Sequence, residues 1–391
     1  MVMKPGNQLK KCLENKMIKK TCLLIGCLLP LLVLQSNAQT CIDTAATAAT
    51  KNLFKNLYRL QQGKIIFGQQ DALAYGVGWK YEKGRSDIHS VVKDRPGIYG
   101  WDIGGIELDS AKNLDAVPFS MMKQFIKEGY KKGAVITISW HMRNPFTGGS
   151  AWDTTKGSLP SILPGGSKHA LFTTWLDKVA AFMNDLKDEK GNYIPVLFRP
   201  FHELTGNWFW WCRNNGTAEE FKTAWTFTID YLKNKKQLHH LLYVYNTAGF
   251  TGKEDFLERY AGDQYADVLS YDMYQFGGRP ERDTFIYQMR AQLELLTKLA
   301  AEKNKIAALA ETGLEAIPDS TWWTETLWPV LKGFPVSYVL VWRNEGYMPS
   351  EKKMHYYGPY PGQVSAKDFK KFYRNPVLLF EKKIKNCKLY K

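Results

Sequence analysis

The stretch PVLFRPFHELTGNWFWW, residues 195 to 211, joins two different kinds of sequence. Its first five residues form a largely apolar run, whereas the remainder brings His202 and Glu203 together with three tryptophans. A short apolar run that ends at turn-forming residues is typical of a buried strand in a parallel sheet. The same order, a strand followed by a polar and aromatic loop and then by a helix, recurs along the chain, and this recurrence decides the fold.

Eight such runs are found, with amphipathic helices between them. The predicted strands cover residues 64–68, 97–101, 134–140, 195–199, 241–246, 268–272, 306–311 and 336–342. Helices with apolar residues at a period of 3.6 are predicted from Lys168, with Ser167 as its cap, from Glu219, and after Asp283. Eight alternating units predict an α/β fold, a single-domain (β/α)8 TIM barrel. The alternative is an open doubly wound sheet. A nucleotide-binding version of it is unsupported, because no glycine-rich phosphate-binding signature opens the first helix.

Composition and charge narrow the class of protein. Of the 391 residues, 45% are hydrophobic and 23% are charged, which favours a large globular core over disorder. The formal net charge of +15 falls to about +10 without residues 1–38, and the remaining basic residues are scattered rather than clustered. We interpret them as a solvated surface and expect no nucleic-acid partner. A monomer is expected.

The N-terminus has the features of a signal peptide. Lysines precede an apolar run from Cys22 to Leu34, and small residues end at Ala38, where cleavage is predicted. Residues 39–391 would then form the catalytic domain, exported to the periplasm or secreted. A lipid anchor at Cys27 is the less favoured alternative. No other stretch has the length of apolar sequence that a transmembrane segment needs.

Three cysteines follow the predicted cleavage site. Cys41 and Cys387 lie near opposite ends of the chain, and an oxidising compartment could join them. Two unpaired thiols are the equal alternative, so the disulfide stays open. Cys212 is interpreted as a packing residue and not as a nucleophile.

Functional side chains in such a barrel lie at the carboxyl ends of the strands. Here these positions hold carboxylates, imidazoles and indoles with few cations, which suits a neutral polyhydroxylated ligand better than a phosphate. A zinc motif such as HExxH and a GxSxG serine motif are both missing from the sequence, so neither a metal nor another cofactor is expected. The candidates are Gln69, Gln70, Asp71, Trp101, Asp102, Trp140, His141, His202, Glu203, Asn246, Asp272, Tyr274, Glu311 and Trp342.

Two glutamates stand out among these candidates. Glu203 follows the fourth predicted strand and Glu311 ends the seventh, so both carboxyls would reach one cavity. Retaining glycoside hydrolysis needs such a pair, one as nucleophile and one as acid/base. Either glutamate could instead cap a strand or pair with Arg199. Aromatic side chains that stack on sugar rings are expected at Trp152, Trp208, Tyr274 and Trp342, whereas Trp210, Trp211, Trp322 and Trp323 are expected in the core.

The motif R-P-x-H-E-x-x-G-x-W-F-W-W, present at residues 199–211, resembles glycoside hydrolase family 26. Its best-known members are endo-β-1,4-mannanases, with rarer mixed-linkage glucanases and xylanases, and the resemblance covers roughly residues 63–347. It implies that Glu203 is the acid/base and that Glu311, in ALAETG, is the nucleophile. The substrate-binding residues that it implies, or that their position suggests, are Asp102, His141, Trp152, Arg199, His202, Trp208, Tyr274 and Trp342.

The sequence therefore predicts a retaining β-1,4-mannanase that hydrolyses mannan, galactomannan or manno-oligosaccharides. A β-1,3-1,4-glucanase or xylanase with the same carboxylates stays open, as does a non-catalytic glycan-binding barrel. The sequence also leaves open endo or mannobiose-releasing exo action, the tolerance of galactose branches and the oligomeric state.

Overall fold

The eight predicted strands form one closed parallel barrel. A computed structural model describes residues 40–391, and the predicted signal peptide with its cleavage site lies outside them. Neighbouring strands pair in chain order, and the last pairs with the first, with Phe67 opposite Val339 and Gly68 opposite Leu340. The barrel strands are β1 (Ile65–Gln70), β4 (Ile98–Asp102), β5 (Val135–Ser139), β6 (Val196–Arg199), β7 (Leu241–Thr247), β8 (Val268–Gln275), β9 (Ile306–Leu314) and β10 (Tyr338–Val341). The (β/α)8 prediction is confirmed.

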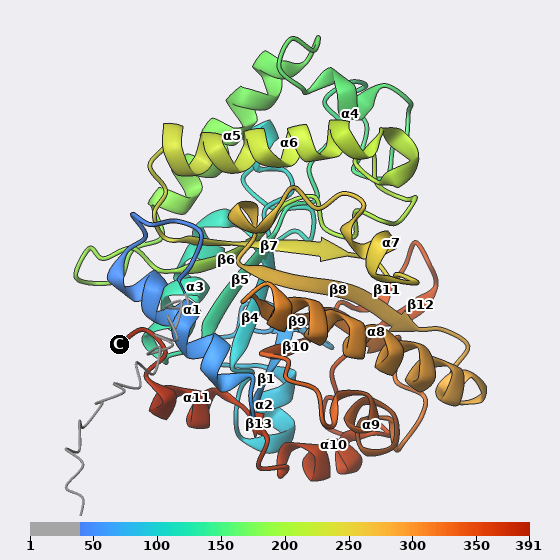
Figure 1. The fold of residues 1–391 in the computed structure, drawn as a ribbon. Coiled ribbons are helices and arrows are strands. Elements are labelled where there is room, and N and C mark those ends of the chain that lie inside the picture. Colours follow the sequence, from blue (N-terminus) through green and yellow to red (C-terminus); the bar gives the residue numbers. More distant parts are fainter. Residues whose placement is uncertain (1–39) are drawn as a thin grey trace, which may run out of the picture. The chain divides into compact units, whose positions relative to one another are not determined.

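Helices fill the connections between successive strands and surround the sheet (Figure 1). They are α2 (Asp87–Val92), α3 (Phe119–Lys131), α4 (Ser158–Ser161), α5 (His169–Asn184), α6 (Ala218–Asp230), α7 (Lys253–Leu257), α8 (Arg282–Glu302) and α9 (Trp328–Leu331), followed after the barrel by α10 (Ala366–Tyr373) and α11 (Glu381–Cys387). Two hairpins, β2–β3 (Tyr75–Gly76 and Trp79–Lys80) and β11–β12 (Gly346–Met348 and Lys353–His355), lie in the loops after β1 and β10, and β13 (Leu378–Leu379) adds to β1.

Alternate strand residues divide the core into two layers. Ile66, Leu197 and Leu340 belong to one buried cluster, inside the barrel, while Phe67, Phe198 and Val339 belong to another, between the strands and the helices. This alternation follows from the two-residue period of a strand. The helix α1 (Ala48–Leu60) contributes Leu53, Phe54 and Leu57 to the inner cluster and so closes the amino-terminal end of the barrel.

Local details of two helices differ from the prediction. The cap of α5 is Lys168 rather than Ser167, and it makes no side-chain capping hydrogen bond. The capping box is found instead at α6, where Thr217 and Glu220 satisfy each other's backbone N–H groups. The start of α6 is therefore marked by a capping motif that the periodicity alone did not identify.

The cysteines of the described region are all free. Cys41 is buried and donates to the carbonyl of Asp43, whereas Cys387 is exposed and lies against the carbonyl of Lys383. Of the two alternatives that the sequence left open, the structure has the unpaired thiols.

Candidate active site

Glu311 reaches the cavity because β9 carries a bulge. Tyr271 of β8 pairs with Leu309, and the next residue, Asp272, pairs with Glu311, so Ala310 is the extra residue. Ala308 and Ala310 face the inside of the barrel, and strict alternation would turn Glu311 outward. The bulge re-aims its side chain into the site, which is a frequent use of bulges beside active sites.

Two donors hold the carboxylate of Glu311. The hydroxyl of Tyr274 donates to Oε2 at 2.7 Å, and the guanidinium of Arg199 donates to Oε1. Arg199 stays cationic because Asp272 and Glu311 raise the pKa of its guanidinium in spite of its burial. A charge-assisted pair and a phenol hydrogen bond both favour an ionised carboxylate, which is the form that a nucleophile needs.

Asn246 joins the loop of Glu203 to this charged group. It lies on β7 and is fully buried, and its Oδ1 accepts from the backbone N–H of Glu203 at 3.0 Å and from Arg199 at 3.1 Å. Its Nδ2 donates to Asp272 at 2.9 Å. Arg199 also donates to Asp272 at 2.6 Å. One amide therefore fixes both the backbone of Glu203 and the partners of Glu311.

Glu203 lies in the loop after β6, in a left-handed backbone conformation with φ of 55°. The indole Nε1 of Trp208 donates to its carboxylate at 2.5 Å, and the thiol of Cys212 donates to its backbone carbonyl. Gly206 allows this arrangement, since a β-carbon there would lie 2.7 Å from the ring of Trp208. Burial raises the pKa of the Cys212 thiol to about 12, which agrees with a packing role.

The pKa of Glu203 is raised to about 7. Burial is the largest cause and the negative charge of Glu311 the second, while the hydrogen bond from Trp208 opposes both. Glu203 therefore retains a proton at a pH where an ordinary glutamic acid has lost it. A proton held on Glu203 is what a general acid needs in order to protonate a leaving group.

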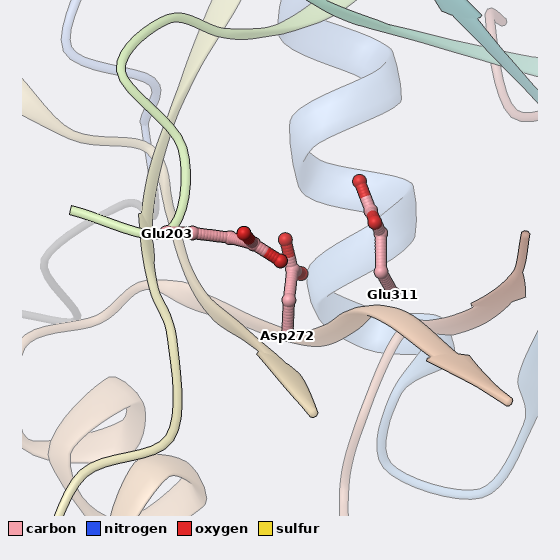
Figure 2. Close-up of side chains that lie close together, drawn as sticks. All are labelled: Glu203, Asp272 and Glu311. Atoms are coloured by element: carbon pink, nitrogen blue, oxygen red, sulfur yellow. The ribbon is translucent and has the colours of Figure 1, made fainter. Parts of the chain in front are cut away.

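Three carboxylates converge at the centre of the site. Figure 2 shows those of Glu203 and Asp272 pointing toward each other with Glu311 beside them, and one oxygen from each lies within 4.8 Å of the others. Such a group has the spacing of a cation site, but the guanidinium of Arg199 already bonds to both Asp272 and Glu311. The positive charge that balances this cluster is part of the chain. Burial raises the pKa of Asp272 as well, although Arg199 opposes the shift.

Two histidines form a chain beside the glutamates. Nδ1 of His141 lies 2.8 Å from Asp102, and its Nε2 lies 3.0 Å from Nε2 of His202. Burial opposes protonation of His141, but Asp102 outweighs it and raises the pKa of this histidine. Burial and then the charge of His141 lower the pKa of His202. The geometry therefore fits a charged His141 that donates to a neutral His202.

Asp102 and Arg199 are buried and bond to other side chains of the site. Asp102 is fully buried, and its oxygens accept from Ser139, from the backbone of Gly104 and from His141. Arg199 bonds to Asp272 and Glu311. Both residues were predicted to bind substrate, and this stays a prediction; the structure shows that they bond to His141 and Glu311, which they can orient.

The aromatic residues separate into exposed and buried groups. Trp152 and Trp208 are 52% and 39% exposed, and Trp152 stacks on His141 with Trp342 at the edge of the same imidazole. Trp210 and Trp211 are buried and donate to the carbonyls of Met142 and His202. The first group is available to a ligand, and the second holds the loops that carry both histidines.

Sequence reasoning missed a cavity beside Glu203. It extends past Trp208 to the loop that follows β8, and its lining residues include Phe276, Gly277 and Phe285. Phe276 lies only two residues beyond Tyr274, but a lone phenylalanine after a strand gives no signal of its own. Asn246 was a candidate by position, and its role as a shared hydrogen-bonding partner could not be predicted.

The fold and the site together define a class of protein. A parallel barrel with two close glutamates at its carboxyl end, one with a raised pKa and one bonded to an arginine, has the arrangement of a glycoside hydrolase. Residues 42–326 match the family described as glycosyl hydrolase family 26. The chain belongs to this family.

Several relatives are known by sequence and by structure. A mannan endo-1,4-β-mannosidase of Bifidobacterium adolescentis is 32% identical over 86% of this chain, and one of Bacillus subtilis is 27% identical over 76% of it. The chain spans about a third (35%) of the Bifidobacterium protein and 80% of the Bacillus one. A family 26 β-mannanase structure from Bacteroides ovatus is 46% identical, covers 88% of this chain and 98% of its own, and has a TM-score of 0.84.

No helix within residues 40–391 combines the length and the apolar composition that a membrane crossing requires.

Proposed function

We propose that the chain is a retaining endo-β-1,4-mannanase. The observation that carries this proposal is the pair of glutamates, whose oxygens lie within 4.8 Å of each other, with a raised pKa on Glu203 and with Arg199 and Tyr274 bonded to Glu311. Retaining enzymes place their two carboxyl groups about 5 to 5.5 Å apart, whereas inverting enzymes need roughly 6.5 to 9.5 Å for an intervening water.

In the first step, Glu311 attacks the anomeric carbon of the sugar, and Glu203 gives its proton to the departing glycosidic oxygen. This leaves a sugar ester on Glu311 and an ionised Glu203. In the second step, Glu203 removes a proton from a water molecule, whose oxygen displaces Glu311 from the anomeric carbon. Arg199 and Tyr274 stabilise the carboxylate of Glu311 before the first step and after the second.

The substrate class rests on the relatives and on the site. The two curated relatives described above are named mannan endo-1,4-β-mannosidases, and the Bacteroides ovatus structure is called a β-mannanase. Trp152 and Trp208 are exposed and Trp342 is partly exposed, so their indoles can stack on pyranose rings. Mixed-linkage glucan or xylan as the substrate receives no such support. Retention of both glutamates argues against a non-catalytic glycan-binding barrel.

The test compares mannan, galactomannan, glucomannan, barley β-glucan and xylan as substrates. We expect products from the β-mannans, with a rapid fall in the viscosity of galactomannan relative to the release of reducing ends, because endo cleavage cuts internal bonds. Products from barley β-glucan or xylan alone would overturn the substrate assignment. Mannobiose released as the sole product from the start would overturn endo action.

We further propose that residues 1–38 are a signal peptide and that residues 39–391 act as a monomeric, exported catalytic domain. The lysines and apolar run near the N-terminus support export. The mass of the protein recovered from periplasm or medium tests the cleavage after Ala38, and light scattering tests the monomer.

A further inference from the structure

The cavity beside Glu203 has a volume of about 770 Å³. Glu203, Trp208, Asp272 and Tyr274 line one end of it, so it is continuous with the catalytic carboxylates. The other walls come from the loop after β7, from the loop after β8, and from the first turns of α8. The residues of these walls are Ala248, Gly249, Met273, Phe276, Gly277, Glu281, Thr284, Phe285 and Gln288.

The side chain of Phe276 lines this cavity and is largely exposed to solvent. It is 80% exposed, the highest value among the large hydrophobic side chains of the described region. The loop that carries it is anchored at its base, because Gln275 donates to the carbonyl of Gly278 and accepts from the buried indole of Trp322 at 2.8 Å. Gly277 and Gly278 both have positive φ, which allows the tight turn. An exposed aromatic ring on an anchored loop beside an active site indicates a ligand-binding surface.

The chemistry of the cavity fits a sugar. Phe276, Trp208 and Phe285 offer apolar faces, while Thr284 and Gln288 on α8 offer a hydroxyl and an amide. A pyranose combines an apolar C–H face with hydroxyls at its rim, so it needs this mixture of groups.

The position of the cavity indicates which part of the substrate it would bind. The acid that protonates the leaving oxygen, Glu203, lines it, whereas His141, Trp152 and Trp342 are not among its lining residues. We propose that this cavity binds mannosyl residues of the leaving part of the chain and that Phe276 is the stacking platform that determines productive binding there. The inference rests on the proposed function and adds the residues that hold the leaving saccharide.

The test compares two kinds of substrate, one without sugars on the leaving side and one with them. An aryl β-mannobioside has a phenol in place of the leaving sugars, whereas mannopentaose and mannohexaose fill the cavity. Phe276→Ala should lower kcat/KM for the oligosaccharides by about tenfold, mainly through KM, and leave that for the aryl glycoside within about twofold. The matched control is Tyr287→Ala, another exposed aromatic residue of this region that does not line the cavity, which should change neither substrate.

Labelling of the products in H₂¹⁸O gives a second measurement, since it shows which glycosidic bond lies at the glutamates. In Phe276→Ala the cleavage positions should move toward those with fewer sugars on the leaving side, and Phe276→Trp should restore the original pattern. Equal loss on both substrates, or an unchanged cleavage pattern, would overturn the inference. If the unaltered enzyme hydrolyses neither substrate, the proposed function itself fails. Thermal unfolding of each variant separates these outcomes from misfolding.

Discussion

Glu203 and Glu311 lie close together but belong to two regions of the barrel that are built differently. Glu311 belongs to a strand, and a cation and a phenol hold its two oxygens. Glu203 belongs to a loop, and among the described residues the indole of Trp208 is the one side chain that donates to its carboxylate. The two carboxylates therefore differ in their partners: Glu311 has an ion pair and a phenol hydrogen bond, and Glu203 has one indole hydrogen bond.

This difference explains how one site can hold a proton-donating glutamate and a nucleophilic glutamate close together. Arg199 is shared between Glu311 and Asp272, whereas Glu203 has no such ion pair within residues 40–391. Glu203, which has no cationic partner in that part of the chain, keeps its proton up to a pH of about 7. The negative charge of Glu311 contributes to that shift, so the nucleophile helps to prepare the acid.

The largest effects are expected from removal of either carboxylate. Glu203→Ala and Glu311→Ala should each reduce mannan hydrolysis by about three to four orders of magnitude. They should differ with a dinitrophenyl β-mannobioside, because its leaving group needs no proton. Glu203→Ala should release a rapid burst of phenol and then turn over slowly, whereas Glu311→Ala should show no burst.

Azide, added as an external nucleophile, gives a second test of the roles of Glu203 and Glu311. It needs no general base, so it should restore turnover of the activated substrate by Glu203→Ala and give a glycosyl azide with retained configuration. A burst in Glu311→Ala and none in Glu203→Ala would mean that the two roles are reversed.

A smaller loss is expected when one partner of Glu311 is removed. Tyr274→Phe deletes the hydrogen bond to Oε2, and a hydrogen bond to a charged group is worth enough to lower kcat by about 10- to 100-fold. Tyr271→Phe is the control, since its hydroxyl donates to the carbonyl of Met289 on the outer face of β8. Equal kcat values for the two variants would show that Tyr274 does not position the nucleophile.

Much of this comparison could be predicted from the sequence. All eight strands were predicted within a few residues, because buried parallel strands leave short apolar runs that end at turn residues. Glu203, His141 and Trp208 follow strand ends, where barrel geometry gathers functional side chains. The rule works here because chain order and spatial order coincide in a barrel.

The remainder depends on side-chain geometry that sequence patterns do not contain. The bulge at Ala310 shifts Glu311 by one register position, and an alanine-rich strand gives no sign of it. Asp102 was predicted to bind a ligand because of its place at the end of β4, but its hydrogen bonds to Ser139 and His141 could not be predicted, since these donors belong to the next strand and its loop. The exposure of Phe276 likewise depends on a loop anchored by Trp322.

The pH profile tests the protonation of Glu203. The value of kcat/KM for manno-oligosaccharides should fall as pH rises through about 7, because Glu203 must carry a proton to act as an acid. The Trp208 hydrogen bond stabilises the charged form, so Trp208→Phe should move this basic limb to higher pH. Trp342→Phe, which alters an indole beside His141, should weaken binding but leave the limb in place. A limb that stays fixed in Trp208→Phe would exclude this indole as a determinant of the pKa.

The smallest effect is one of stability. The pKa of Glu203 is higher in the folded protein than in the unfolded chain. The stability that its protonated carboxyl contributes is therefore fully present at low pH and is lost as pH rises through about 7. Glu203→Gln resembles the protonated acid at every pH. It should therefore raise the free energy of unfolding at pH 8 by about 1 to 2 kcal/mol relative to the unaltered protein, and by little at pH 5. Urea unfolding at the two pH values measures this difference.

The control variant is Glu311→Gln. It should be destabilised at both pH values, because Arg199 loses a charged partner in a buried site. A Glu203→Gln protein no more stable than the parent at pH 8 would mean that the loop relieves the buried charge in another way.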